Sequence, residues 1–354
     1  MIRSVCLIPA LILAAFLYCG KDNREIKITG KQKMTDELKL SAQIELLRVE
    51  LKTISQDFPL DSPDGFSAAL DSAADRIRGM LAESKDPREI IRELNEIIFR
   101  KWNIVFDSKA DKFENLFPHL VYLNRRGSCV GISLLYLLIG EKTGLPLYGV
   151  VVPGHFFVRY DDFVSRFNIE MMKKGAIMSD CWYLEKYAVA DSEYYDLGNL
   201  NTPKIISVLR YNAGNIFHLQ KKNSLAESQY RSALVTWPGY AEASGNLAVV
   251  LGEEGRDKEA LDILSALKAE TPRLKNIDKN LAAVMIKNGL YAGAVKCYRD
   301  ALLKASSDPE LYYGMAVAFK YLKDFKGARE ALDSCKALDP AFKAAEKFFS
   351  ELYE

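Results

Sequence analysis

Residues 125–162 read RRGSCVGISLLYLLIGEKTGLPLYGVVVPGHFFVRYDD, and this stretch predicts the fold of the N-terminal half of the chain. From Cys129 to Gly140 the apolar residues point to nearly every side of a helix, which is typical of a helix buried at the centre of a domain. The segments LYGVVVP, HFFVRY and RFNIEMM come next, are rich in Val and Phe, and predict three short strands. Asp161 and Asp162 predict a turn between the last two strands.

Helices are also expected before this stretch, because residues 35–103 carry helical periodicity. Asp86 and Pro87 predict the start of one of these helices, with a side-chain cap followed by a first-turn proline. Helices followed by an antiparallel sheet predict an α+β domain, with expected bounds at residues 35–200.

The C-terminal half contains a repeat with a period of 34 residues. Alanine recurs at Ala226, Ala260, Ala294 and Ala328. A second small position recurs at Gly214, Ala248, Ala282 and Ala316, and a large position at Tyr230, Leu264, Tyr298 and Leu332. Proline closes three units and would stop the second helix of each, whereas Ser306 takes its place in the third. This register resembles that of tetratricopeptide repeats, so we expect an all-α superhelix of four units, with a capping helix, over residues 207–354.

The first residues have the pattern of an export signal. Arg3 precedes an apolar run from Val5 to Tyr18, which is shorter than the ~20 residues that a membrane-spanning helix needs. Cys19 follows, and the arrangement resembles a bacterial lipoprotein signal, although Tyr18 stands where that family prefers a small residue. The expected segments are a signal peptide over 1–18 and a tether over 19–34, with a lipid on Cys19.

The alternatives for these residues are an uncleaved anchor or an ordinary secretion signal. In each case the chain leaves the cytoplasm, and the lipoprotein interpretation places it in the periplasm or on the outer surface, anchored to a bacterial membrane.

The composition argues against several classes of partner. Lys and Arg number 48 against 47 Asp and Glu, and no basic block stands out, which argues against nucleic acid. The cysteines beyond the signal show neither CxxC spacing nor a nearby pair of histidines, and no dinucleotide fingerprint is present. We therefore expect neither a bound metal nor a cofactor.

Cys129 is the candidate nucleophile, because a thiol reacts as the thiolate and a helix N-terminus and a nearby cation favour that form. Three histidines could act as the base. His119 lies in an apolar segment and His218 in a repeat helix, so His155, at the start of a strand after a Pro-Gly turn, remains by elimination.

A catalytic imidazole also needs an acceptor that orients it. Side chains alternate along a strand, so Asn168 and Glu170 of the segment RFNIE share one face. Either of the two could accept the His155 N–H while the other supports the site.

The stretch from Arg125 to Asp162 resembles the transglutaminase-like superfamily, and within it the SirB1 N-terminal type. It carries R-R-G-x-x-x-x-(I/L)-S-L-L-Y followed by G-L-P-L-x-G-V-x-x-P-G-H-F-x-V-R. The resemblance implies a papain-like α+β core and a Cys-His-acid triad that performs thiol acyl transfer or amide hydrolysis. It implies that Cys129 is the nucleophile, His155 the base and Glu170 the third member. The superfamily usually has Asp at that third position, so Asn168 stays an alternative.

Two functions follow from this pattern. The first is an exported thiol protease, amidase or acyltransferase, with peptide or isopeptide bonds as substrates and a repeat domain that binds a protein or peptide. The second is a catalytically silent transglutaminase-like scaffold that binds protein partners through the repeats, because many SirB1-type sequences lack the cysteine. This chain retains the cysteine.

Overall fold

The computed structural model describes residues 39–56, 58–59, 65–84, 86–109, 111–187, 196–272, 276–342 and 348. The predicted signal peptide, the tether and Cys19 lie outside the described residues, as does most of the predicted capping helix. The chain divides into two compact units between Asn212 and Ala213. Within the described ranges, no helix is both long and apolar enough to span a bilayer.

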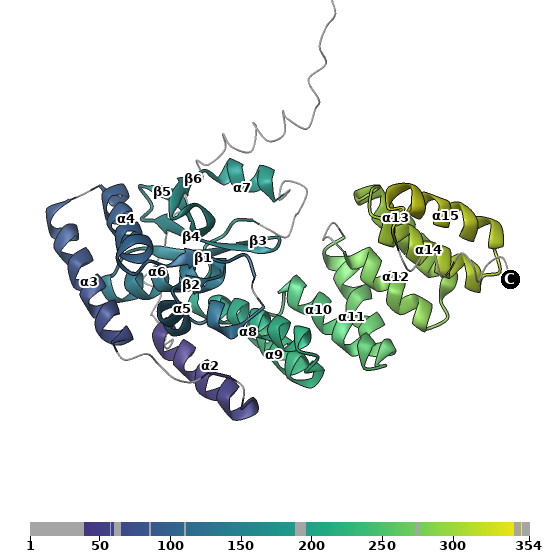
Figure 1. The fold of residues 1–354 in the computed structure, drawn as a ribbon, viewed down its shortest axis with the longest axis horizontal. Coiled ribbons are helices and arrows are strands. Elements are labelled where there is room, and N and C mark those ends of the chain that lie inside the picture. The colour runs from purple at the N-terminus through teal and green to yellow at the C-terminus, as the bar shows by residue number, and fades with distance from the viewer. Residues whose placement is uncertain are drawn as a thin grey trace, which may run out of the picture. The chain divides into compact units, whose positions relative to one another are not determined.

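The N-terminal unit begins with helices that pack around one central helix (Figure 1). Asp86 caps one of them by accepting a hydrogen bond from the Arg88 N–H at 2.9 Å, and Pro87 is its first residue, so the predicted helix start is confirmed. The helices before the central one are α2 (Leu40–Ile54), α3 (Phe66–Glu83), α4 (Pro87–Asn95), which continues as a π-helix over Glu96–Lys101, and α5 (Pro118–Asn124).

The central helix α6 (Cys129–Thr143) is buried from Val130 to Gly140, as its all-round apolar sequence predicts. It starts at a Ser128 cap and ends at Gly144, whose φ of 76° is the left-handed conformation that glycine adopts without strain. Gly131 lies so close to the chain that a Cβ there would be 2.3 Å from the Asn115 carbonyl oxygen. A residue without a side chain is therefore required near the start of α6.

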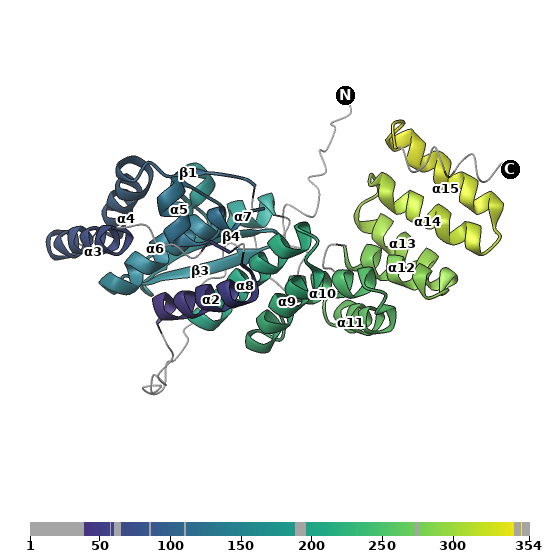
Figure 2. The same ribbon diagram turned by 60° about the horizontal axis from the view of Figure 1, so that its bottom comes forward.

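A four-stranded antiparallel sheet lies beside α6, which packs along its first two strands (Figure 2). The strands run in the order β3 (Leu147–Val152), β4 (His155–Asp161), β5 (Arg166–Glu170) and β6 (Ala176–Met178). The α+β arrangement is confirmed, but the sequence predicted three strands and missed β6, which is only three residues long. Two further short strands, β1 (Val105–Phe106) and β2 (Arg126–Gly127), form a separate parallel pair.

A short helix, α7 (Asp180–Lys186), follows β6. Ser179 caps it by accepting a hydrogen bond from the Trp182 N–H.

The remaining helices succeed one another with short connections, and consecutive helices pack together from α9 onward. All four alanines of the 34-residue repeat are fully buried, and Tyr230, Leu264 and Leu332 are completely buried with them. A Cβ on Gly214 would be 2.5 Å from the Tyr230 ring, which shows why that position is small. The predicted tetratricopeptide register is confirmed. The helices are α8 (Thr202–Leu219), α9 (Asn223–Thr236), α10 (Ala241–Glu253), α11 (Asp257–Glu270), α12 (Ile277–Lys287), α13 (Tyr291–Lys304), α14 (Pro309–Tyr321) and α15 (Phe325–Leu338).

Candidate active site

Cys129 is a half-buried free thiol at the first residue of α6. The Ser128 hydroxyl accepts the Gly131 N–H at 3.2 Å, and the Ser128 N–H donates to the Asn115 carbonyl at 2.8 Å. A helix start leaves its first N–H groups without partners inside the helix. Within the described residues, the N–H groups of Cys129 and Val130 have no hydrogen-bond acceptor. They could therefore bind the oxyanion of a tetrahedral intermediate attached to the sulfur.

His155, the first residue of β4, is buried and stands between the thiol and a carboxylate. Its Nε2 lies 2.9 Å from Oε2 of Glu170, and the Cys129 side chain is close enough to raise the pKa of its ring. Because Glu170 occupies Nε2, Nδ1 is the nitrogen left for the sulfur. The ring of Tyr187 stacks on the imidazole at a centroid distance of 4.9 Å and an angle of 5°.

The pKa of His155 is raised to about 9. Burial alone would lower it, but the hydrogen bonds and charges of Cys129 and Glu170 favour the protonated ring and outweigh burial. The imidazole therefore carries a positive charge at neutral pH and provides the cation that stabilises a thiolate.

Glu170 ends β5 and is completely buried. Burial would raise the pKa of its carboxyl group, but the hydrogen bond and charge of His155 outweigh burial and hold the pKa below its usual value. Two more donors satisfy the carboxylate, the Tyr183 hydroxyl and the Met172 N–H, each at 2.9 Å. The carboxylate is thus kept ionised against the imidazole.

Asn168 lies on the same strand but does not meet His155. Its Oδ1 accepts from Nε of Arg159 at 2.7 Å, and its Nδ2 donates to Oδ1 of Asp180 at 2.6 Å. The strand register explains the difference, because Arg159 of β4 is directly opposite Asn168. Of the two acceptors that the sequence left open, the structure brings only Glu170 to the histidine.

The other two histidines lie elsewhere. His119 is buried near Arg48, and burial lowers the pKa of its imidazole to about 3, so the ring is neutral. His218 contacts Glu253 at 3.0 Å in the C-terminal unit. Neither histidine contacts Cys129 or Glu170, so their positions give no support to either as the base.

The sequence interpretation missed the contribution of α7 to the site. Tyr183 binds Glu170, and Tyr187, the residue just after the helix, covers His155. Neither tyrosine was among the predicted site residues. The helix is attached to the sheet by the buried Arg159, whose Nη2 lies 2.7 Å from Oδ1 of Asp180. The aromatic spacing in SDCWYLEKY was the one signal in the sequence, and it does not specify which residue the rings would face.

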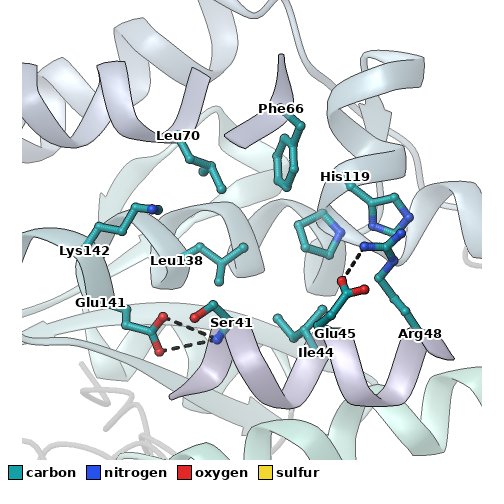
Figure 3. A pocket seen from close by; sticks show the side chains of 11 residues that line it. Ser41, Ile44, Glu45, Arg48, Phe66, Leu70, His119, Leu138, Glu141 and Lys142 are labelled. Carbon is teal, nitrogen blue, oxygen red and sulfur yellow. Dashed lines mark hydrogen bonds and ion pairs between the residues drawn. The ribbon is translucent and has the colours of Figure 1, made fainter. Parts of the chain in front are cut away.

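A small pocket of about 100 Å³ lies between α2, α3, α5 and α6 (Figure 3). Glu141 accepts the Ser41 N–H there, and Glu45 pairs with Arg48 at 2.5 Å. Cys129 does not line it. Among the described residues, no cluster of three or more His, Cys, Asp or Glu side chains could hold a metal ion.

The thiol of Cys129, the imidazole of His155 and the carboxylate of Glu170 lie together where the start of α6 meets β4 and β5. Residues 64–188 match the transglutaminase-like superfamily model. F-box only protein 21 of Homo sapiens is 32% identical over 161 residues, and that of Mus musculus is 31% identical. The match covers 42% of this chain but only about a quarter of each of those proteins.

The helices of the chain are similar to solved repeat proteins. MamA from Desulfovibrio magneticus RS-1 is 16% identical, with a TM-score of 0.36, and the alignment covers 42% of this chain and 93% of the MamA chain. YrrB, a tetratricopeptide repeat protein with an unusual peptide-binding site, is 16% identical with a TM-score of 0.38, and the alignment covers 47% of this chain and 84% of the YrrB chain. The family match confirms the transglutaminase-like domain, and the buried 34-residue register of the paired helices confirms the repeats; the SirB1 subtype stays a prediction.

Proposed function

We propose that the transglutaminase-like domain is a thiol-dependent acyltransferase or amide hydrolase. The observation that supports this proposal is that His155 lies hydrogen-bonded to the buried carboxylate of Glu170 and interacts with the Cys129 side chain, which raises the pKa of its imidazole. This arrangement holds an imidazolium beside a sulfur at a helix N-terminus, and both features favour the thiolate.

The reaction has two steps. The Cys129 thiolate attacks an amide carbonyl, and the N–H groups of Cys129 and Val130 stabilise the oxyanion. The tetrahedral intermediate collapses as the C–N bond breaks, and the His155 imidazolium gives its proton to the departing amine. A thioester is left on Cys129. Water or a second amine, deprotonated by His155, then attacks the thioester and releases an acid or a new amide, and Cys129 regains its thiolate.

Alkylation of the full chain by iodoacetamide tests this proposal. Labelling of Cys129, measured by peptide mass spectrometry, should be fast well below the free-thiol pKa of ~8.5, and it should slow in His155→Ala. Cys297 and Cys335 are buried free thiols whose pKa values are raised by burial, so they serve as internal controls. Slow labelling of Cys129 with a midpoint near 8.5 in both proteins would exclude the enzyme and favour the scaffold.

The proposal includes an extracytoplasmic location. The apolar run before Cys19 and the charged residues after it support export and lipid attachment. In a bacterial host, Cys19→Ala should move the protein from the membrane fraction to the soluble fraction. Equal membrane association of both forms would count against the lipid.

The proposal also assigns peptide or isopeptide bonds as substrates and a protein segment as the ligand of the repeats. Tetratricopeptide-like helix pairs support the second assignment because stacked repeats present extended binding surfaces. Binding of substrate proteins should therefore weaken when residues 213–354 are removed, as measured by co-precipitation. Undiminished binding after this removal would count against the repeats as the binding domain.

A further inference from the structure

Two lysine ammonium groups meet at one indole ring beside the proposed site. Nζ of Lys173 lies 4.8 Å from the centre of the Trp182 ring, and Nζ of Lys186 lies 4.4 Å from it. Neither ammonium has a carboxylate within ion-pair distance in the part of the chain that the structure describes. A cation–π contact at an exposed site stabilises only weakly, so the two like charges remain available to an anion.

Ring contacts connect this pair to the triad. Nζ of Lys186 also lies 5.2 Å from the Tyr187 ring, which stacks on His155. Trp182 packs edge-on against Tyr183, whose hydroxyl binds Glu170. The lysine on α7 is therefore one aromatic ring away from the imidazole.

None of the three carboxylates nearest to the pair in the described sequence neutralises the two lysines. Glu170 is buried and bound to His155, and Asp180 is bound to Arg159. Glu185 is exposed and makes no ion pair with either lysine. Among the residues that the structure describes, the rim of the site at α7 thus carries an excess of positive charge.

We propose that Lys173, Lys186 and Trp182 form an anion-binding edge of the acyl-donor site. The preferred substrate class is an amide acyl donor that carries a carboxylate near the scissile carbonyl. This inference rests on the proposed function of Cys129.

A pair of alkylating reagents tests the inference without a known substrate. Iodoacetate and iodoacetamide react in the same way: the Cys129 sulfur forms a bond to carbon, the C–I bond breaks, iodide leaves and His155 keeps its proton. The reagents differ in charge, so the ratio of their rates at Cys129 reports the local potential. The charge of His155 is present in every variant and cancels from the comparison.

The full chain carrying Lys173→Gln and Lys186→Gln should show a fall in the iodoacetate-to-iodoacetamide ratio of about three- to fivefold at 0.1 M salt. Lys142→Gln is the matched control. Lys142 is at the other end of α6 from Cys129, about 20 Å along the helix axis, which exceeds the Debye length of ~10 Å at 0.1 M salt. This variant should leave the ratio unchanged.

Salt gives a second measurement that needs no variant. Raising the ionic strength should lower the wild-type ratio towards that of the double variant. The inference is overturned if Cys129 alkylates rapidly in all proteins and the ratio responds neither to the two substitutions nor to salt. If Cys129 shows no acceleration with either reagent, the proposed function itself fails.

Discussion

At the residue scale, the position of one carboxylate decides the state of the histidine. Glu170 contacts His155 at 2.9 Å and is the proposed third member of the triad, at a position where the superfamily that the sequence resembles usually has aspartate. Its longer side chain begins at the end of β5, one strand away from His155, and reaches Nε2 while also accepting from Tyr183. A buried carboxylate with three donors is rigid, which fixes the ring orientation that a base requires.

Glu170→Gln should shift the alkylation pH profile of Cys129 upward. The amide keeps the size of the side chain but removes the charge that favours the imidazolium, so we expect the rate at pH 6–7 to fall by about tenfold or more. Alkylation kinetics across pH measure this effect.

Asn168→Ala is the matched comparison, because Asn168 contacts Arg159 and not His155. It should reduce the free energy of unfolding by about 1–3 kcal/mol and leave the midpoint of the profile in place. A shift with Asn168→Ala but not with Glu170→Gln would assign the orienting role to the asparagine.

The stability of the N-terminal unit should depend on pH through His155. The pKa of a histidine is ~6.5 in an unfolded chain and about 9 here, so its stabilising contribution is complete below pH ~6.5 and is lost as the pH rises through 9. The loss should be about 3 kcal/mol. Urea denaturation at pH 6.5 and 9.5 should show the difference between wild type and His155→Gln shrinking over this interval; a constant difference would contradict the raised pKa.

At the scale of elements, two helices form the site together with the sheet. The start of α6 presents the thiol, and α7 presents the aromatic rings that cover His155 and complete the hydrogen bonds of Glu170. Helix α7 is short, and the start of α6 is tightly packed, so the position of each helix depends on a specific contact. For α7 that contact is the buried Arg159, and for α6 it is the close approach at Gly131.

Asp180→Asn should release α7 from the sheet. The substitution removes the carboxylate that is paired with the fully buried Arg159, and an uncompensated buried charge costs about 3–5 kcal/mol. We expect a lower free energy of unfolding in urea together with slower alkylation of Cys129. Glu185→Gln, on the same helix and without an ion pair among the described residues, should change both quantities little.

Gly131→Ala should disturb the start of α6. Its Cβ would approach the Asn115 carbonyl to 2.3 Å and the Val121 side chain to 2.8 Å, and backbone atoms cannot move aside cheaply. We expect destabilisation of roughly 1–3 kcal/mol or more, measured by denaturation. Gly79→Ala in α3 has open space around it and should instead stabilise by about 0.5–1 kcal/mol. Equal effects of the two substitutions would refute the packing argument.

At the scale of the whole molecule, the chain combines two units with different folding patterns. The N-terminal unit depends on contacts between residues far apart in sequence, such as Cys129, His155 and Glu170. The C-terminal unit is built from consecutive helices that pack on their neighbours, so its stability is approximately a sum over repeats and their interfaces.

Gly314→Ala should destabilise the C-terminal unit without changing the chemistry at Cys129. The added Cβ would lie 2.3 Å from the Tyr298 ring, and overpacking of this kind costs about 1–3 kcal/mol. Gly245→Ala is the control in the same unit, because its nearest contact would be an ordinary 3.9 Å. Thermal unfolding and Cys129 alkylation should be measured together; a large change in the alkylation rate with Gly314→Ala would show that the units are coupled.

The order of elements, the repeat register and the start of α6 could be predicted from sequence because each rests on local periodicity, capping or spacing. Ser128 and Cys129 mark a helix start by their neighbours alone, and the four alanines mark the repeat by their spacing. The choice of Cys129 and His155 came from the same local features and from a family resemblance.

The tertiary structure decided which polar groups meet. Asn168 and Glu170 share one face of one strand, so alternation alone cannot separate them. The register of β4 against β5 sets Asn168 opposite Arg159 and leaves Glu170 to His155. The placement of α7 over the imidazole is likewise set by an ion pair of the buried Arg159 with Asp180, a residue 21 positions further along the chain. Such contacts depend on how separate elements pack, which no local pattern in the sequence records.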